Sequence, residues 1–237
     1  MNVLNEYRTV MHLISNRASI ARYGDGELRI CVGRNAKLQH YHPELSQKLK
    51  SILKSRLEKL LVAVPRIFDR DVWPTEQKAV FWNTYSKDKK YLSLYDRNLV
   101  YGSAFITRPD SVGKEIYRDS YFDLMKVLWQ GRRVLLLQGP DGSFAKSDGL
   151  FSTCSRLDII YGPGKDAFND YDSLLKKCLK ETKPWEEEEI IVLSLGPTAT
   201  VLASDLCMYG RQALDLGHLA MFYNKLRKGG NVNDKTA

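Results

Sequence analysis

The chain has 237 residues, of which 43% are hydrophobic, and it carries a formal net charge of +8. This length suits one domain with a sizeable core, and the absence of any apolar run of about 18 residues predicts no transmembrane helix. The lysines and arginines are spread along the chain without an arginine-rich run or an aromatic RNA-binding motif, so no nucleic-acid partner is expected. A basic surface also suits an anionic small substrate or the anionic face of a membrane.

The N-terminal stretch and the cysteines both favour a cytoplasmic location. "MNVLNEYRTVMHLISNR" is typical of an amphipathic helix and not of a signal peptide, because it has no basic start and no continuous apolar run. The cysteines are scattered without a CxxC pair, which favours neither a disulfide framework nor a zinc site: Cys31, Cys154, Cys178 and Cys207. Peripheral association with the inner face of the membrane is left open, and no oligomeric state follows from the sequence.

Taken in chain order, apolar strand-like segments alternate with helix-like ones. Residues 18–23 predict a first strand, and 43–57 predict a helix that begins with Pro43 and has Leu45, Leu49, Ile52, Leu53 and Leu57 on one face. The later expected elements are a strand at 59–65, a helix at 113–131 closing on Gly131, strands at 132–139 and 157–163, and a helix at 170–181. An apolar strand then leads to Gly196, a helix covers about 198–209, and a last strand ends at Asp215.

This alternation predicts the fold class. Nearly all-apolar strands separated by helices indicate a parallel sheet that is covered on both faces, so we expect an α/β, Rossmann-like, mostly parallel sheet with helices on both faces. Residues 1–226 are expected to form a single domain and the tail, 227–237, to be disordered. Glycine-containing polar segments follow the expected strands, at the carboxyl ends where such sheets bind ligands: "GDGE", "QGPDGS", "YGPG", "LGPTAT" and "LGH".

The segment "GDGE" places Asp25 and Glu27 among two glycines, Gly24 and Gly26, directly after the first strand. It is either a polar turn or a site for a cation or substrate. Two neighbouring acids repel each other unless something positive lies between them. Carboxylates bind Mg²⁺ or Mn²⁺, and these ions bridge to phosphate oxygens.

The segment "LGPTAT" predicts a junction from strand to helix. Gly196 permits a tight turn, Pro197 fits the first turn of a helix, and Thr198 and Thr200 place hydroxyl groups beside free N–H groups. This arrangement suits a phosphate, and a plain threonine cap is the alternative. It is neither a dinucleotide-binding GxGxxG motif nor a Walker A loop.

Three further segments hold candidate residues. Arg108 precedes a proline, so it is expected in extended backbone, where it would clamp a phosphate or make a surface ion pair. His218 follows the last strand and would be a metal ligand, a base or a surface residue, whereas His40 and His42 are expected to be loop residues. Residues 138–151 form either a mobile lid or an ordinary surface loop.

Two hydrolase classes do not fit. No GxSxG segment is present, and Asp25 and Glu27 are too close in sequence to flank a glycosidic bond. A cation site, a phosphate loop and a Rossmann-like sheet together favour a nucleotide-diphosphate sugar, with the cation stabilising the departing diphosphate.

The segments "IARYGDGELRIC", "FITRPD", "GPGKDAFNDYDSLL" and "LSLGPTATVLASDLCMYGRQALDLGH" resemble the GT-D-type glycosyltransferases, a bacterial family formerly called DUF1792. The resemblance covers about residues 18–218. It implies a UDP-linked sugar donor and a divalent cation, Mn²⁺ or Mg²⁺, held through Asp25 and Glu27. We expect His218 to aid in holding the cation, which makes Asp25, Glu27 and His218 the expected catalytic residues. The resemblance also implies that the family's arginine corresponds to Arg108, its "GPTAT" loop to residues 196–200, and its closing motif to Asp215, Gly217 and His218. We therefore expect a substrate-binding set of Arg22, Gly24, Gly26, Arg108, Gly196, Pro197, Thr198, Thr200 and Asp215.

Characterised members of that family extend glycans on bacterial surface glycoproteins, and others serve surface polysaccharides. This chain departs from their pattern at Gln138 and Gly139, where they have an acid and a glycine, in "SFAKSDGLF", and in "GHLA". The sequence therefore predicts a metal-dependent hexosyltransferase with its glycan acceptor, sugar, stereochemistry and base left open. The alternatives are another Rossmann-like nucleotide-dependent enzyme, such as a methyltransferase, and a non-catalytic partner that binds sugar nucleotides.

Overall fold

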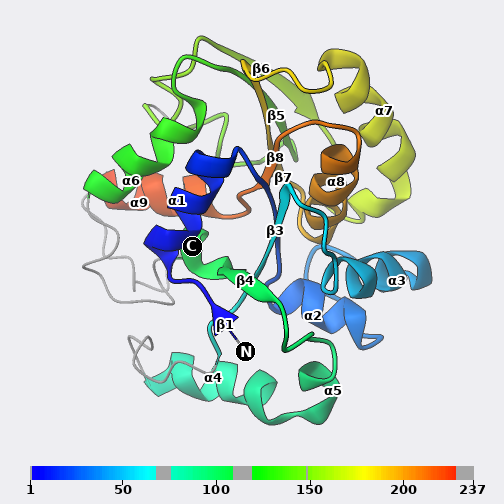
Figure 1. The fold of residues 1–237 in the computed structure, drawn as a ribbon. Coiled ribbons are helices and arrows are strands. Elements are labelled where there is room, and N and C mark those ends of the chain that lie inside the picture. Colours follow the sequence, from blue (N-terminus) through cyan, green and yellow to red (C-terminus); the bar gives the residue numbers. More distant parts are fainter. Residues whose placement is uncertain (1, 68–75, 109–118, 148, 228–237) are drawn as a thin grey trace.

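The computed structural model describes residues 2–67, 76–108, 119–147 and 149–227, which surround a single eight-stranded sheet (Figure 1). All strand pairs are parallel, in the order β1-β4-β3-β2-β8-β7-β5-β6. The strands are β1 (Asn2–Val3), β2 (Ser19–Arg22), β3 (Leu60–Val64), β4 (Val100–Ser103), β5 (Arg133–Gln138), β6 (Arg156–Tyr161), β7 (Glu189–Ser194) and β8 (Ala213–Asp215).

Helices cover both faces of this sheet (Figure 1). One layer contains α1 (Glu6–Asn16), α6 (Asp119–Lys126) and α9 (Leu219–Arg227), and the other contains α2 (Asp25–Cys31), α3 (Pro43–Ile52), α7 (Tyr171–Glu181) and α8 (Pro197–Met208). The helices α4 (Glu76–Lys87) and α5 (Lys89–Leu92) lie beyond the edge formed by β1 and β4. The predicted α/β fold is therefore confirmed.

The burial of the strands follows from this arrangement. The central strands β2, β3 and β8 are buried along their whole length, because helices cover both of their faces. The edge strand β6 is partly exposed throughout, and Tyr161 at its end is half-exposed. Helix α8 packs between the sheet and both α3 and α7, so every residue except Met208 is buried. This explains why α8 has apolar residues on all sides and not in one stripe, and why its polar residues are buried as well: Thr198, Thr200, Ser204 and Asp205.

Two helix predictions need correction. The helix predicted over 43–57 ends at Ile52, because turn hydrogen bonds from the N–H groups of Lys54 and Ser55 to the carbonyls of Ser51 and Ile52 close the chain before it enters β3. Leu57 still packs against the core, but from a loop. The helix predicted over 113–131 includes residues outside the described ranges. Its described part is α6, followed by a 3₁₀ turn and Gly131 at φ +70°.

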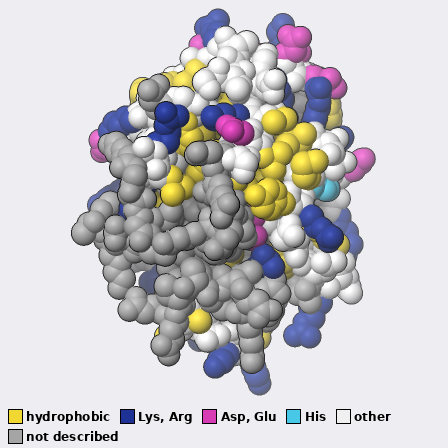
Figure 2. Space-filling model, turned by 90° about the vertical axis from the view of Figure 1, so that its left-hand side faces the viewer, with side chains coloured by type: hydrophobic (Ala, Val, Ile, Leu, Met, Phe, Trp, Pro, Cys, Tyr) yellow, Lys and Arg dark blue, Asp and Glu magenta, His cyan; other side chains and the backbone are white. Residues whose placement is uncertain are grey.

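The α1 layer also exposes apolar side chains. Figure 2 shows hydrophobic side chains gathered on the face that carries α1, α6 and α9. The exposed large hydrophobic residues of this layer are Tyr7, Met11, Val127 and Met221. Among the described residues, no helix is both long enough and apolar enough to span a lipid bilayer. Arg227 ends α9, and the rest of the predicted tail lies outside the described residues.

Candidate active site

A cavity of about 700 Å³ opens at the carboxyl edge of the sheet. It is lined by segments that follow β2, β5, β6, β7 and β8. The chain leaves β5 outward to β6 but leaves β7 back to β8, so the connections of these adjacent strands diverge. Such a divergence opens a crevice that open α/β sheets use for ligands. The predicted position of the site at the strand ends therefore coincides with this cavity.

The segment "GDGE" forms the beginning of helix α2 and not a turn. Gly24 is the N-cap in extended backbone, and its N–H donates a 2.6 Å hydrogen bond to Oε2 of Glu27. A β-carbon on Gly24 would lie 3.2 Å from that oxygen, so the glycine makes room for the carboxylate. Gly26 is helical and has no positive φ. Asp25 and Glu27 both line the cavity.

Glu27 and Asp215 share one arginine, Arg22. All three residues are buried, and Nη2 of Arg22 lies 3.9 Å from Oδ1 of Asp215. Burial raises the pKa of Glu27 to about 7, with Arg22 opposing the rise and Asp215 adding to it. Burial likewise raises the pKa of Asp215. At both acids burial is the largest cause of the raised pKa, and the attraction of Arg22 opposes it.

Thr198 and Thr200 do not present their hydroxyl groups to the cavity. Both side chains are buried. The Thr200 hydroxyl donates to Oδ2 of Asp215 at 3.0 Å and lies 3.1 Å from the carbonyl oxygen of Arg22. The Thr198 hydroxyl is bonded to Oε1 of Gln39 at 3.4 Å. The expectation that these hydroxyl groups hold a phosphate is therefore corrected: they join α8 to the sheet and to a loop, while Gly196 and Pro197 line the cavity.

Arg108 and His218 also line the cavity. Arg108 follows a 3₁₀ turn, Ala104–Thr107, at φ −131° and ψ 67°, and its guanidinium lies 5.7 Å from the ring centre of Phe222 in α9. His218 directly precedes α9. Asp215 lies behind the cavity wall, where it bonds Thr200 and the backbone N–H of Arg22.

Two lysines of the cavity were missed from the sequence, Lys37 and Lys165. They lie on separate loops that are tied together: the N–H of His40 donates to Oδ1 of Asp166 at 2.6 Å, and Nδ1 of His40 lies 2.8 Å from Oδ2. His40 is thus a loop residue, as expected. The signal available in the sequence was "YGPGK", a lysine directly after a glycine-rich strand end.

The segment 138–151 contributes to the cavity wall. Asp141, Gly142 and Ser143 line it, whereas Phe144 and Phe151 are buried in the core. Gln138 is fully buried, and its Oε1 accepts a 3.4 Å hydrogen bond from the N–H of Ala145. The described part of this segment is therefore mostly a surface loop that forms one wall of the cavity and is anchored by two buried aromatic side chains.

The charges of the cavity suit an anionic ligand that is accompanied by a cation. Its basic residues are Arg22, Lys37, Arg108 and Lys165, and its acids are Asp25, Glu27 and Asp141. No group of three or more potential metal-binding side chains occurs among the described residues. A cation held here would have two protein carboxylates and would take further oxygen ligands from the substrate or water, which is common for Mg²⁺.

Comparison with known protein families shows to which family the chain belongs. The family model described as "Glycosyltransferase GT-D fold" matches residues 20–236. The chain belongs to the glycosyltransferase GT-D fold family. This confirms the resemblance seen in the sequence, and it places the "RYGDGE" and "LGPTAT" segments of this GT-D domain within one matched region.

Two curated streptococcal proteins are similar to this GT-D domain. "Probable glycosyl transferase Gly" of Streptococcus gordonii is 28% identical over 235 residues, which is 98% of this chain and 34% of that protein. "Glycosyltransferase GlyD" of Streptococcus pneumoniae serotype 4 is 29% identical over 234 residues, 96% of this chain and 28% of that protein. The chain thus spans about a third or less of the length of these relatives.

Solved structures of the family share the fold. A structure of domain of unknown function 1792, described as having a distinct glycosyltransferase fold, is 32% identical with a TM-score of 0.89, covering 100% of this chain and 84% of that chain. A DUF1792 glycosyltransferase from Streptococcus sanguinis is 27% identical with a TM-score of 0.87, covering 100% and 87%.

Proposed function

We propose that this chain is a glycosyltransferase domain that takes a sugar from a nucleotide-diphosphate donor, a UDP-hexose, and transfers it to a glycan acceptor of the bacterial surface. The observation that carries this proposal is the carboxyl-edge cavity, in which a carboxylate pair and several cationic side chains converge within a GT-D fold. Its volume of about 700 Å³ lies within the usual range for sites that enclose small organic ligands.

Several residues of the chain fit the donor diphosphate. Lys37, Arg108 and Lys165 line the cavity from three separate loops, so their positive charges can surround one anion. Gly196 and Pro197 begin α8 at the cavity, and the backbone N–H groups of a helix's first turn favour a phosphate. The tie between His40 and Asp166 holds two of these loops at a fixed spacing.

Asp25 and Glu27 fit a divalent cation, Mn²⁺ or Mg²⁺. Both line the cavity, both offer the hard oxygen ligands that these ions prefer, and a cation would stabilise the charged form of Glu27, whose pKa is raised by burial. When bound, the ion supplies Lewis-acid stabilisation of charge on the departing diphosphate. The hydrogen bond from the N–H of Gly24 holds the Glu27 carboxylate in place for this role. Arg22, which lies near Glu27, is positioned in turn by its ion pair with Asp215.

The test is calorimetric titration of a panel of UDP- and GDP-sugars and S-adenosylmethionine, with Mn²⁺ and with EDTA, together with an assay for sugar release or transfer. We expect a UDP-sugar to bind in Mn²⁺ and to be turned over, and both signals to disappear in EDTA. Metal-independent binding of S-adenosylmethionine would favour a methyltransferase instead. Donor binding without hydrolysis or transfer to any acceptor would favour a non-catalytic module.

A matched pair of variants locates the effect. Asp25→Asn removes one carboxylate from the cavity and is expected to weaken donor binding in Mn²⁺. Asp123→Asn makes the same chemical change on α6, where Asp123 is exposed and bonded to Lys126, and should leave binding unchanged. Equal donor affinities of the two variants in Mn²⁺ would show that Asp25 does not contribute to the donor site.

A further inference from the structure

A smaller cavity lies at the opposite, amino edge of the sheet, and we call it the amino-edge cavity. It measures about 140 Å³ and is lined by residues that precede β2, β3, β5 and β8. At about 30 Å³ for each water, this is the volume of four or five waters. It is too small for a nucleotide sugar and is suited to a compact ion.

Four basic and two acidic residues line the amino-edge cavity, so its charged side chains are mostly positive: Arg17, Lys59, Arg132 and Arg211, with Glu186 and Glu187. In the described part of the chain, the recorded hydrogen bonds of Arg132 go to the carbonyls of Leu128 and Glu189, and those of Arg211 go to carbonyls of Tyr209, Leu179 and Thr182. Lys59 donates to the carbonyl of Asn16. Carbonyl groups accept these hydrogen bonds but do not neutralise the charges.

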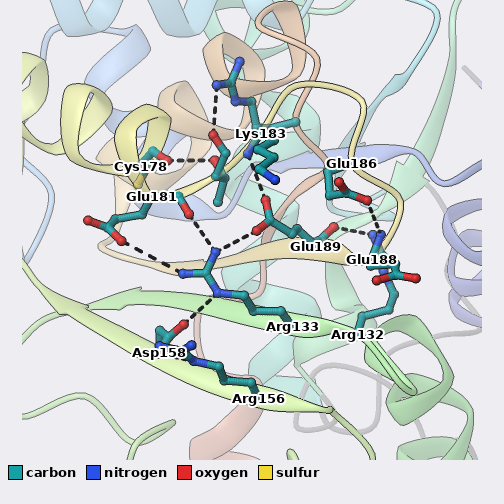
Figure 3. Close-up of polar contacts among 12 residues, drawn as sticks. Arg132, Arg133, Arg156, Asp158, Cys178, Glu181, Lys183, Glu186, Glu188 and Glu189 are labelled. Carbon is teal, nitrogen blue, oxygen red and sulfur yellow. Dashed lines mark hydrogen bonds and ion pairs between the residues drawn. The ribbon is translucent and has the colours of Figure 1, made fainter.

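The charge of the neighbouring Arg133, in contrast, is neutralised by carboxylates. Its guanidinium contacts Asp158 and Glu189 at 2.7 Å and Glu181 at 4.0 Å (Figure 3). Arg132, one residue earlier in the sequence, donates to the backbone carbonyls of Glu189, also drawn in Figure 3, and of Leu128. The recorded ion pair at the cavity is that of Arg17 with Glu187, at 2.6 Å and on the exposed surface. Burial and the nearby Arg17 lower the pKa of Arg132 to about 10.

Two of the cavity's residues have a backbone conformation that side chains disfavour. Arg17 has φ +48° and Trp185 has φ +60°, in the left-handed region that costs free energy for a residue other than glycine. Trp185 is 74% exposed. Its ring packs on Gly210, where a β-carbon would meet it at 2.7 Å. The chain thus keeps a strained, exposed tryptophan at the wall of a basic cavity.

We propose that the amino-edge cavity is a second binding site, for a compact phosphate-class dianion such as a phosphomonoester group. Arg17 and Lys59, at the rim, and the inner guanidinium of Arg132 together supply the charge, and Trp185 forms an apolar wall. Guanidinium groups recognise phosphate oxygens through paired N–H donors. The group can belong to a free metabolite or to the headgroup of a membrane lipid, and the experiment distinguishes these two sources.

The first measurement titrates inorganic phosphate into the protein and follows tryptophan emission. Binding at the amino-edge cavity is reported by the change in emission that wild type shows and Trp185→Phe lacks. Phosphate binding at the carboxyl edge should not depend on Trp185. We expect Arg17→Ala and Lys59→Ala each to weaken this binding roughly tenfold, as the loss of a charge-assisted hydrogen bond does. Glu187→Gln removes the competing acid and should strengthen it.

The second measurement identifies the source of the phosphate group. Sedimentation with phosphatidic acid vesicles, compared with phosphatidylcholine alone, tests a lipid headgroup. Loss of sedimentation in the Arg17→Ala, Lys59→Ala double variant supports the lipid, whereas phosphate binding without sedimentation supports a free phosphomonoester.

The control variant is Lys54→Ala, which removes one positive charge from an exposed position outside the cavity. It should change neither the emission signal nor sedimentation. If wild type gives no Trp185-dependent signal and no sedimentation, the proposal is overturned. The basic residues of the cavity would then serve only to donate hydrogen bonds to backbone carbonyls near the strand ends. A loss in Lys54→Ala equal to that in Lys59→Ala would overturn it as well, because net charge alone would explain the binding.

Discussion

A β-carbon on Gly217 would lie 2.0 Å from Nη2 of Arg22 and 2.9 Å from its Cζ. The bare backbone of Gly217 is therefore one wall of the space that holds the Arg22 guanidinium. Gly217 has φ +44°, and its carbonyl accepts a 3.0 Å hydrogen bond from the Ser194 hydroxyl. The connection after β8 thus places Arg22 beside Asp215 and the cavity.

Gly217→Ala is expected to displace the Arg22 guanidinium and to impose backbone strain. We expect it to lower the free energy of unfolding by about 1–3 kcal/mol and to weaken donor binding, as measured by urea denaturation and calorimetry. Gly33→Ala is the matched control, because Gly33 has φ +82° but nothing within 4 Å of a β-carbon, so it reports strain alone. If both variants lose equal stability and keep donor affinity, Gly217 is only a turn residue.

Glu27 should make the stability of the metal-free protein depend on pH. Its pKa is raised from 4.5 to about 7, so the folded protein binds this proton more tightly than the unfolded chain does. The stabilisation is complete below pH 4.5 and is lost as pH rises through about 7. In EDTA at about pH 8, Glu27→Gln should therefore be more stable than wild type, by at most about 3 kcal/mol.

The measurement is urea unfolding of wild type and Glu27→Gln across this pH range. The two curves should converge as the pH approaches 4.5. Parallel curves at every pH would show that the Glu27 carboxylate is as well compensated in the folded state as in water. In Mn²⁺ the advantage of the variant should shrink, because the cation stabilises the charged form of wild type.

Thr200→Val tests the inward-facing threonines. The substitution keeps the side-chain volume but removes the hydroxyl that donates a buried hydrogen bond to Asp215. It should therefore lower the free energy of unfolding by about 1–3 kcal/mol. The affinity for the nucleotide-sugar donor, measured under conditions in which the variant is fully folded, should change little, because Thr200 does not line the cavity. The control Thr153→Val removes a part-buried hydroxyl bonded to one carbonyl and should cost less. A selective loss of donor affinity in Thr200→Val would return this hydroxyl to the binding site.

Arg108 is expected to bind the diphosphate through its planar fork. Arg108→Ala should weaken donor binding by roughly tenfold or more, and Arg108→Lys should recover only part of it, because lysine keeps the charge but loses paired donors. Calorimetry with UDP measures both. Arg97→Ala, at an exposed position outside the cavity, controls for net charge. Unchanged affinity in both Arg108 variants would place this residue outside the donor site.

The position of the site could be predicted from the sequence because it depends on local patterns. Apolar strands that alternate with helices can only form a covered parallel sheet, and glycine-containing polar segments after those strands then meet at one edge. Asp25, Glu27, Gly196 and His218 reach the cavity for this reason, whereas Arg108 reaches it from the segment after β4, a strand that was not predicted from the sequence. Their functions stay predictions, and so do the bounds of the domain.

Tertiary structure alone decided which way the polar side chains face. A threonine at a helix start is compatible with solvent, ligand or core, and Thr200 faces inward because Asp215 and the Arg22 carbonyl lie on adjacent strands that meet it there. Lys37 and Lys165 line one cavity because several hydrogen bonds, including those of Asp166 with His40 and with the carbonyl of Leu38, tie loops that are 126 residues apart in sequence. Such contacts depend on strand order and loop packing, which hydrophobic periodicity does not specify, since periodicity records only which face of each element is buried.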